Sequence, residues 1–169
     1  MILKMTRQAV IQEKMYYFPV HLLPFSATPI EVIGLTEALE AGMEISYLDR
    51  HFSSIDILST IKAAEELGLA RKEGSFVSLT DLGIGFTKAS DGKAGIIRMG
   101  LVRVEPFKTM LEILKKRKSI TPHELSQELE KKSALLSVSE DSLRTLLIEW
   151  GISSSLLDYD GKAFRLARK

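Results

Sequence analysis

The sequence predicts a mainly α-helical protein with small β-hairpin wings, built as two winged-helix (helix-turn-helix) domains in tandem. The main observation is a unit that occurs twice: an amphipathic helix with a polar N-cap, a glycine after the helix, and a short hairpin. The first copy covers about residues 54–79 with Gly68 after its helix, and the second covers about 139–166 with Gly151 in that place. Two more helices precede each copy, and three helices followed by a hairpin is the order of a winged helix.

This repeat divides the chain into four predicted segments. A chain of 169 residues can hold two small domains of roughly 70 residues each, and each copy of the unit supplies an apolar helix face for its own core. At the N-terminus we expect a short helix over about 4–16, followed by an aromatic cluster, Tyr16-Tyr17-Phe18, that packs on the domain. The predicted segments are an N-terminal arm at 1–27, a first winged-helix domain at 28–90, a connecting helix or linker at 91–104, and a second winged-helix domain at 105–169.

The first domain begins at a helix-start signal, Thr28-Pro29-Ile30-Glu31. It contains a Thr N-cap, a proline in the first turn, where a backbone N–H is not needed, and a Glu placed to bond back to the cap. This helix ends at Gly42, and a shorter helix covers 46–52. The third helix begins at Ser53-Ser54-Ile55-Asp56, and its inward face is predicted to carry Ile57, Leu58, Ile61 and Ala64. The hairpin that follows turns at Glu73-Gly74-Ser75.

The second domain repeats this scheme. Lys115-Lys116-Arg117-Lys118 follows its first helix, where cations oppose the negative end of the helix dipole, and Thr121-Pro122-His123-Glu124 is the same start signal as before. Ser139 caps the third helix, whose buried stripe is predicted to be Leu143, Leu146, Leu147 and Trp150. Asp160-Gly161 predicts a tight hairpin turn in which both central residues have positive φ.

Composition and motifs argue against an enzyme. With no cysteine, the chain has neither disulfides nor thiolate metal sites, and His21, His51 and His123 lack a second ligand at helical spacing. Gly92-Lys93 is followed by Ala94 and lacks the glycine that opens a nucleotide-binding loop. The Gly-x-Ser-x-Gly motif of hydrolases is also missing. We therefore expect no catalytic residue, no cofactor and no metal.

The sequence also bears on where the protein acts. The N-terminus has no apolar run ahead of a small-residue cleavage site, and no segment approaches the roughly 20 apolar residues that span a membrane. The absence of cysteine fits a reducing compartment. We expect a cytoplasmic protein that is not inserted in a membrane.

The charge on the third helices argues against DNA reading. A winged helix offers its third helix to the major groove, where cations meet phosphates and Arg, Asn or Gln side chains meet base edges. The chain has a formal net charge of only +1. Acidic residues outnumber basic ones on both third helices, which carry Asp56, Glu65 and Glu66 against Lys62 in the first domain and Glu140, Asp141 and Glu149 against Arg144 in the second.

Basic residues elsewhere keep DNA binding open as an alternative. They occur at the first wing, after the first helix of the second domain, and at the second wing, and could hold a phosphate backbone. The candidate contacts are Arg71, Lys72, Lys115, Lys116, Arg117, Lys118, Arg165, Arg168 and Lys169.

Several motifs resemble those of the AAA-associated C-terminal domain family, over about residues 23–166. They are Leu23-Pro24, Ile33-Gly34-Leu35, Ala64-Glu65-Glu66-Leu67-Gly68, Leu79-Thr80-Asp81-Leu82-Gly83, Phe86, Ala89, Pro106-Phe107, Glu149-Trp150-Gly151 and Leu157-Asp158-Tyr159-Asp160. In that family the domain is fused behind the ATPase subunit of nitrate, sulfonate and taurine type ABC transporters or occurs alone. The family tends to continue Trp-Gly with Arg-Tyr, where this chain has Ile152-Ser153. The resemblance implies an accessory role without a reaction.

Two functions follow from these observations. The preferred one is a non-catalytic regulatory or protein-interaction module whose partner is a protein, such as the transporter ATPase subunit that the resemblance implies. The alternative is a winged-helix transcriptional regulator that binds DNA. Because winged helices often pair through an end helix, we also consider a homodimer formed through residues 3–22 or 93–117.

Overall fold

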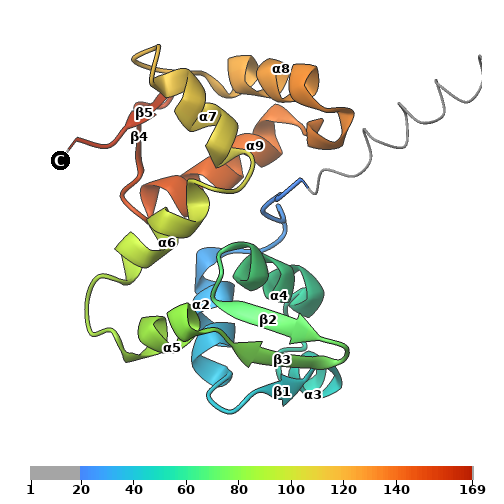
Figure 1. Cartoon of the computed structure of the whole chain (residues 1–169). Helices are drawn as coiled ribbons and strands as arrows, with labels where there is room; N and C mark the ends of the chain where they lie inside the picture. Colours follow the sequence, from blue (N-terminus) through green and yellow to red (C-terminus); the bar gives the residue numbers. More distant parts are fainter. Residues whose placement is uncertain (1–19, 169) are drawn as a thin grey trace, which may run out of the picture.

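The computed structural model describes residues 20–168, which form helices and two small antiparallel sheets (Figure 1). This confirms the predicted mainly α-helical fold with β-hairpins. The predicted helix over about 4–16 and the Tyr16-Tyr17-Phe18 cluster lie outside the described residues. We refer to residues 28–90 as the N-terminal half and to residues 105–168 as the C-terminal half, because Figure 1 shows them as two bodies joined by the α6 segment.

The N-terminal half contains three helices and a three-stranded sheet before its last helix. Its elements are α2 (Pro29–Ala38), β1 (Met43–Glu44), α3 (Ile45–His51), α4 (Ile57–Glu66), β2 (Ala70–Glu73), β3 (Phe76–Leu79) and α5 (Asp81–Lys88). The sheet has the order β1-β3-β2, with Met43 opposite Val77 and Arg71 opposite Ser78. Gly74 has a φ of 61° in the predicted hairpin turn. The two-residue strand β1 extends this hairpin and was not predicted.

The C-terminal half repeats this order with a smaller sheet. Its elements are α7 (Phe107–Leu114), α8 (Pro122–Lys132), the 3-10 turn η1 (Ala134–Leu136), α9 (Glu140–Leu146), the π-helix η2 (Leu147–Ile152), β4 (Leu157–Tyr159) and β5 (Phe164–Leu166). An isolated bridge joins Ile120 to Phe164. Ile120 lies between α7 and α8, and β1 lies between α2 and α3, so each half adds a short third segment to its hairpin.

Side-chain caps fix the helix starts that the sequence predicts. Thr28 and Thr121 each form a capping box with the Glu three residues later, and the Ser139 side chain accepts a hydrogen bond from the N–H of Ser142. In α4 the cap is Asp56, two residues later than Ser54, because the Asp56 carboxylate accepts the Ser59 N–H at 3.1 Å.

Two local predictions in the C-terminal half are wrong. Gly151 does not end the third helix, because η2 continues through Ile152. A Cβ atom at Gly151 would lie 2.4 Å from Cδ1 of Leu157, so the glycine is needed for close packing. Asp160 does not have positive φ either, although Gly161 does. The Asp160 carboxylate instead accepts the N–H groups of Lys162 and Ala163, which makes a four-residue loop.

The connection between the halves is packed against both of them. Helix α6 (Lys93–Leu101) approaches α4 so closely that a Cβ atom at Gly100 would lie 2.9 Å from the Leu67 side chain. On its other side, Arg98 Nη1 donates to the carbonyl of Ser154 at 2.8 Å. Lys93 pairs with Glu37 at 3.0 Å. Helix α6 thus lies within the segment 91–104, and it contacts both halves.

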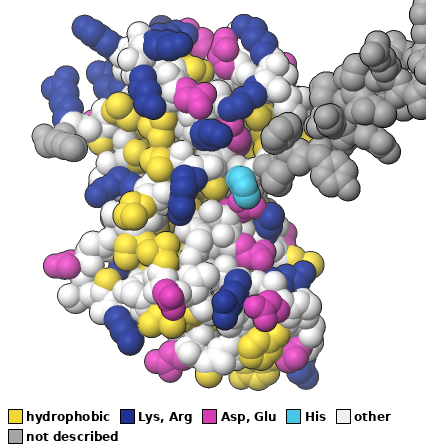
Figure 2. Space-filling view, in the orientation of Figure 1, with side chains coloured by type: hydrophobic (Ala, Val, Ile, Leu, Met, Phe, Trp, Pro, Cys, Tyr) yellow, Lys and Arg dark blue, Asp and Glu magenta, His cyan; other side chains and the backbone are white. Residues whose placement is uncertain are grey.

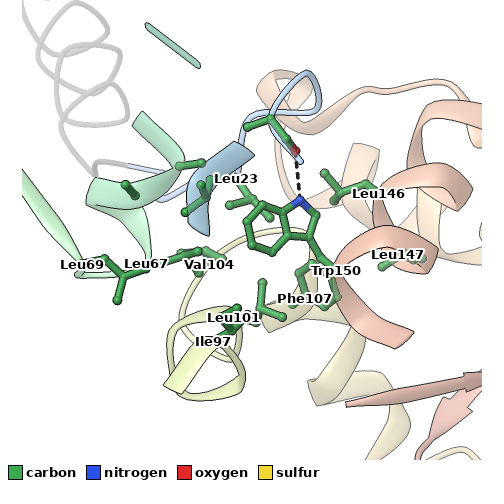
Figure 3. Close-up of a cluster of buried hydrophobic side chains, with 14 of the residues drawn as sticks. Leu23, Leu67, Leu69, Ile97, Leu101, Val104, Phe107, Leu146, Leu147 and Trp150 are labelled. Atoms are coloured by element: carbon green, nitrogen blue, oxygen red, sulfur yellow. Dashed lines mark hydrogen bonds between the residues drawn. The ribbon is translucent and has the colours of Figure 1, made fainter. Parts of the chain in front are cut away.

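Trp150 is buried at the junction of the two halves. This confirms its predicted place on the buried stripe of the third helix. Its indole N–H donates to the carbonyl of Ala27 at 3.0 Å (Figure 3). Figure 3 also shows buried side chains from separate segments around the ring: Leu23 before α2, Leu101 at the end of α6 and Phe107 at the start of α7. Apolar burial of this kind is the main stabilising contribution in a fold of this size.

The segment before α2 pairs with the start of the C-terminal half. Leu22 bridges Glu105, the Leu23 N–H donates to the Glu105 carbonyl at 3.0 Å, and the Glu105 N–H donates to the His21 carbonyl at 2.7 Å. The Glu105 side chain is buried and bonds to Thr109 and Lys132. Residues far apart in the sequence thus join the segment before α2 to the start of the C-terminal half.

Candidate interaction surfaces

The outward side of α4 is less acidic than its sequence predicts. The Glu66 side chain is only 6% exposed and lies between His21 at 2.9 Å and Lys62 at 2.7 Å. Glu65 accepts the N–H of Lys72 on β2 at 3.2 Å. Both carboxylates, which the sequence counts toward an acidic third helix, therefore have partners: β2 bonds to Glu65, and His21 in the segment before α2 pairs with Glu66. The exposed positions on this side are Asp56, Leu58 and Lys62, and Leu58 was wrongly predicted to face inward.

The outward side of α9 is acidic and apolar. The Asp141 side chain is 91% exposed and holds Arg144 at 2.7 Å, which raises the pKa of the guanidinium. Further along the same side, Ile148 and Ile152 are exposed on η2. Lys62 on α4 and Arg144 on α9 are the two cations of these helices, and both are neutralised by a carboxylate one turn away. Neither helix presents a free cation to a phosphate.

The structure brings together most of the predicted basic residues of the C-terminal half. They line an open groove with a volume of about 510 Å³ between the end of α7 and the end of β5. Figure 2 shows Lys and Arg side chains gathered over the upper part of the molecule, where Figure 1 draws α7, α8 and the β4–β5 hairpin. The basic groove, as we name it, is lined by Leu114, Lys115, Lys116, Arg117, Lys118, Ser119, Arg165, Leu166 and Arg168.

The remaining predicted contacts are elsewhere. Arg71 and Lys72 lie on β2 of the N-terminal half, where Arg71 faces Glu73 at 3.6 Å. They do not line the basic groove. Lys169 lies outside the described residues. The candidate DNA contacts therefore do not form a single surface in the part of the chain from 20 to 168.

Two of the groove cations are paired with carboxylates. Arg117 Nη2 lies 2.6 Å from Glu124 Oε1, and Arg165 pairs with Asp160. The Thr121 N–H and then Arg117 lower the pKa of Glu124 to about 2, and the N–H groups of Ala163 and Lys162 lower the pKa of Asp160. Within residues 20–168, no carboxylate lies within ion-pair distance of Lys115, Lys116, Lys118 or Arg168, the other groove cations. The groove therefore keeps a positive charge.

A second surface of note is apolar. Met99 and Val102 are exposed on and just after α6, at 62% and 41%, and Ile148 and Ile152 are exposed on η2. The bond from Arg98 to Ser154 holds α6 beside the end of η2. Figure 2 shows hydrophobic side chains exposed along the side of the molecule on which α6 runs. Exposed apolar side chains that gather in this way are typical of protein interfaces.

The chain matches a known protein family. The family described as the C-terminal AAA-associated domain matches residues 49–160, which is more than half of the chain. The chain belongs to this family. The match confirms the resemblance that the sequence motifs indicate. No curated protein and no solved structure matches the chain.

The matched region of the AAA-associated domain includes parts of both halves. It begins within α3 and ends just after β4, so it contains α4, α6 and α9 but not β5. The family description names an association with AAA proteins and no reaction. Arg165 and Arg168 of the basic groove lie outside the match, whereas Lys115 to Lys118 lie within it.

Within residues 20–168, the grouping of histidine and carboxylate side chains bears on metal binding, and the length of the helices bears on membrane insertion. Among residues 20–168, no three His, Asp or Glu side chains gather as a metal ion would require. His123 pairs with Glu140, and His51 stacks on Tyr47. No described helix is long and apolar enough to cross a membrane.

The exposed apolar residues of the α6 segment and η2 are not among the residues predicted from the sequence. Ile148 and Ile152 are four residues apart on one helix side, and this spacing was a usable signal. Met99 and Val102 are three residues apart and also share one helix side, but a helix between two bodies can bury either side. Only the packing of α6 against Leu67 and Ser154 determines which side faces solvent.

The Glu124 carboxylate makes a pH-dependent contribution to stability. Its pKa falls from 4.5 to about 2 on folding, so the contribution is present above pH 4.5 and is lost as the pH falls toward 2. Because 38% of this side chain is exposed, water screens the interaction, and we expect only about 1 kcal/mol at pH 7. Glu124→Gln should lower the free energy of unfolding by this amount at pH 7 and by almost nothing near pH 2, as measured by urea denaturation.

Glu31→Gln is the matched control for this measurement. Glu31 occupies the same position in the capping box of α2, and no arginine pairs with it among the described residues. Its substitution is expected to lower the free energy of unfolding at pH 7 by less than Glu124→Gln does, because no arginine is lost as a partner. An equal change in both variants would show that Arg117 contributes nothing.

Proposed function

We propose that this chain is a non-catalytic regulatory or interaction module that docks on a partner protein in the cytoplasm. In this proposal the module consists of two winged-helix domains, at 28–90 and 105–169, joined by the helical segment at 91–104. The fusion to transporter ATPase subunits that the sequence resemblance implies makes an ATPase subunit of the ABC transporter type the first partner to consider, and the family description names an association with AAA proteins.

The order of elements supports the winged-helix interpretation. In the N-terminal half, α2, β1, α3 and α4 precede the β2–β3 hairpin, and β1 pairs with the returning strand β3. In the C-terminal half, α7, Ile120, α8 and α9 precede the β4–β5 hairpin, and Ile120 pairs with the returning strand β5. The same sequence of helices and pairings in both halves favours two related units.

The charge of α4 and α9 is the observation that carries the proposal. In a winged helix that reads DNA, these helices would meet the phosphates. Here both of their cations are held by carboxylates, Asp141 is almost fully exposed, and Leu58 and Ile148 face solvent. A mixed acidic and apolar surface suits a protein partner better than a polyanion.

Co-migration with an ATPase subunit tests this proposal. The chain is mixed at about 10 µM with a nitrate, sulfonate or taurine type ABC transporter ATPase subunit encoded in the same genome, and the mixture is analysed by size-exclusion chromatography with light scattering. We expect a complex with a mass above that of either protein, and no complex with a soluble P-loop ATPase of another class. Separate elution of the chain and the transporter subunit would contradict the proposal.

The alternative, a DNA-binding regulator, rests on the positive charge of the basic groove. Six cations line it, and four of these have no carboxylate partner among the described residues. Under this alternative, replacing Lys115, Lys116, Arg117 and Lys118 with alanine flattens the dependence of DNA affinity on salt concentration. Unchanged salt dependence would remove these residues from a DNA site.

A further inference from the structure

The basic groove runs beside the free edge of strand β5. On one side β5 pairs with β4, with Leu157 opposite Leu166 and Tyr159 opposite Phe164. On the other side Phe164 exchanges both backbone hydrogen bonds with Ile120, at 2.8 and 2.9 Å. Beyond this single bridge the edge is open, and Leu166 together with residues 114–119 lines the groove.

The hydrogen-bond pattern shows where the Leu166 backbone points. In an antiparallel pair, successive residues direct their N–H and C=O groups to alternate sides. Phe164 uses the side of Ile120, and the Ala167 N–H donates to the Leu156 carbonyl on the opposite side at 3.0 Å. Leu166 therefore directs its N–H and C=O toward the side of Ile120, where the groove lies. Among residues 20–168, neither group has a hydrogen-bond partner outside the β4–β5 hairpin.

Charge surrounds this open backbone position on the groove side. Lys118 precedes Ser119 and Ile120 on one wall, and Arg168 follows Leu166 on the other. Neither Lys118 nor Arg168 has a carboxylate partner among the described residues. The Leu166 side chain itself is 45% exposed. The groove thus offers a backbone donor and acceptor, an apolar contact, and cations on both walls.

We propose that the basic groove binds an extended acidic segment of the partner protein, which adds as a strand to the free edge of β5. Backbone hydrogen bonds to Leu166 would hold the segment, and its carboxylates would face Lys118 and Arg168 on the two walls. This inference deepens the proposed function and rests on it, since it names the part of the partner that is recognised.

The geometry favours an acidic peptide over a nucleic acid. A DNA-binding winged helix would use its third helix together with a basic surface, but no residue of α9 lines the groove. The outward side of α9 also carries the exposed Asp141. An unpaired strand edge offers both an N–H donor and a C=O acceptor, and an extended peptide can pair with both, whereas a phosphate diester only accepts hydrogen bonds.

The test measures binding of a fluorescein-labelled peptide of about eight residues, in which Glu and Val alternate, to the intact chain by fluorescence anisotropy. We expect saturable binding that weakens about tenfold or more in the double variant Lys118→Glu, Arg168→Glu. The matched control is Arg71→Glu, Lys72→Glu, which makes the same charge change on exposed residues of the other hairpin and should leave binding within about twofold of the wild type. Circular dichroism verifies that both variants are folded.

A second probe separates strand addition from simple charge attraction. The same peptide with alternate backbone nitrogens methylated keeps its carboxylates but cannot complete a strand pair, so we expect it to bind at least about tenfold more weakly. Equal binding of the methylated peptide, no loss in the groove variant, or stronger binding and full competition by duplex DNA would each overturn this inference.

Co-migration of the groove variant with the ATPase subunit distinguishes failure of the groove inference from failure of the proposed function. If the Lys118→Glu, Arg168→Glu variant still co-migrates with the subunit as the wild type does, the partner docks elsewhere and only the groove inference is wrong. If the wild type itself does not co-migrate, the proposed function is wrong. Loss of co-migration in the groove variant alone supports both.

Discussion

Glu105→Ala is expected to lower the free energy of unfolding by about 3 kcal/mol. The Glu105 side chain is buried, with Oε1 accepting from Lys132 Nζ at 2.7 Å and from Thr109 Oγ1 at 2.9 Å. Its other oxygen, Oε2, accepts the Thr109 N–H at 3.1 Å. Alanine removes all three bonds and leaves the buried Thr109 N–H and hydroxyl without their acceptor. Lys132 is partly exposed and can turn to water, which limits the loss.

Glu112→Ala is the control for this measurement, because Glu112 is exposed on the same helix, α7. Urea denaturation followed by circular dichroism at pH 7 gives both values, and the control is expected to change stability by less than about 0.5 kcal/mol. Glu105→Gln should lie between the two, since it keeps one oxygen for Thr109 but presents an amide to the ammonium of Lys132. A loss below about 1 kcal/mol in Glu105→Ala would show that the buried Glu105 side-chain bonds to Thr109 and Lys132 contribute little to the stability of the C-terminal half.

Trp150→Ala is the second substitution with a large expected effect, a loss of about 4 kcal/mol. The ring is fully buried beside Leu23, Leu101 and Phe107, which come from the segment before α2, from α6 and from α7, and alanine leaves a cavity among these side chains (Figure 3). It also removes the indole N–H from the Ala27 carbonyl. Trp150→Phe keeps most of the apolar area, so we expect a smaller loss of about 2 kcal/mol, caused mainly by the carbonyl that loses its donor.

Ile152→Ala, at a partly exposed position of the same η2 helix, controls for a general effect of changing this helix. It should cost less than about 1 kcal/mol by the same denaturation measurement. Trp150 is the only tryptophan, so wild-type unfolding can be followed by its fluorescence and compared with circular dichroism. If Trp150→Ala were no less stable than Ile152→Ala, the shared core around Trp150 would be contradicted.

Local signals predicted the elements of this fold that depend on neighbours in the sequence. The boxes at Thr28 and Thr121, the cap at Ser139 and the turn at Gly74 all involve residues no more than three positions apart, so their geometry follows from residue type. The Leu79-Thr80-Asp81-Leu82-Gly83 motif also has a physical reason. A Cβ atom at Gly83 would lie 1.9 Å from the carbonyl oxygen of Leu69, so only glycine fits.

Contacts between distant residues explain what the sequence did not predict. Strand β1 has two residues and Ile120 forms a single bridge, and segments this short carry no alternation to detect. In the sequence nothing distinguishes Glu66 from a surface carboxylate. In the structure its carboxylate bonds to His21, which is 45 residues away. Lys118 and Arg168 are 50 positions apart in the sequence. They line the same groove because Ile120 pairs with Phe164. The open edge at Leu166 follows from the same pairing.

The choice between a protein partner and DNA is tested most directly by titrating the intact chain into fluorescein-labelled duplex DNA of mixed sequence at 50 mM and 200 mM salt, with anisotropy as the readout. Because α4 and α9 present no free cation, we predict binding no tighter than the roughly micromolar to 100 µM range of non-specific contacts. Nanomolar binding at 50 mM salt that weakens steeply at 200 mM, and that is lost in Ser142→Glu, Thr145→Glu on the outward side of α9, would contradict the account.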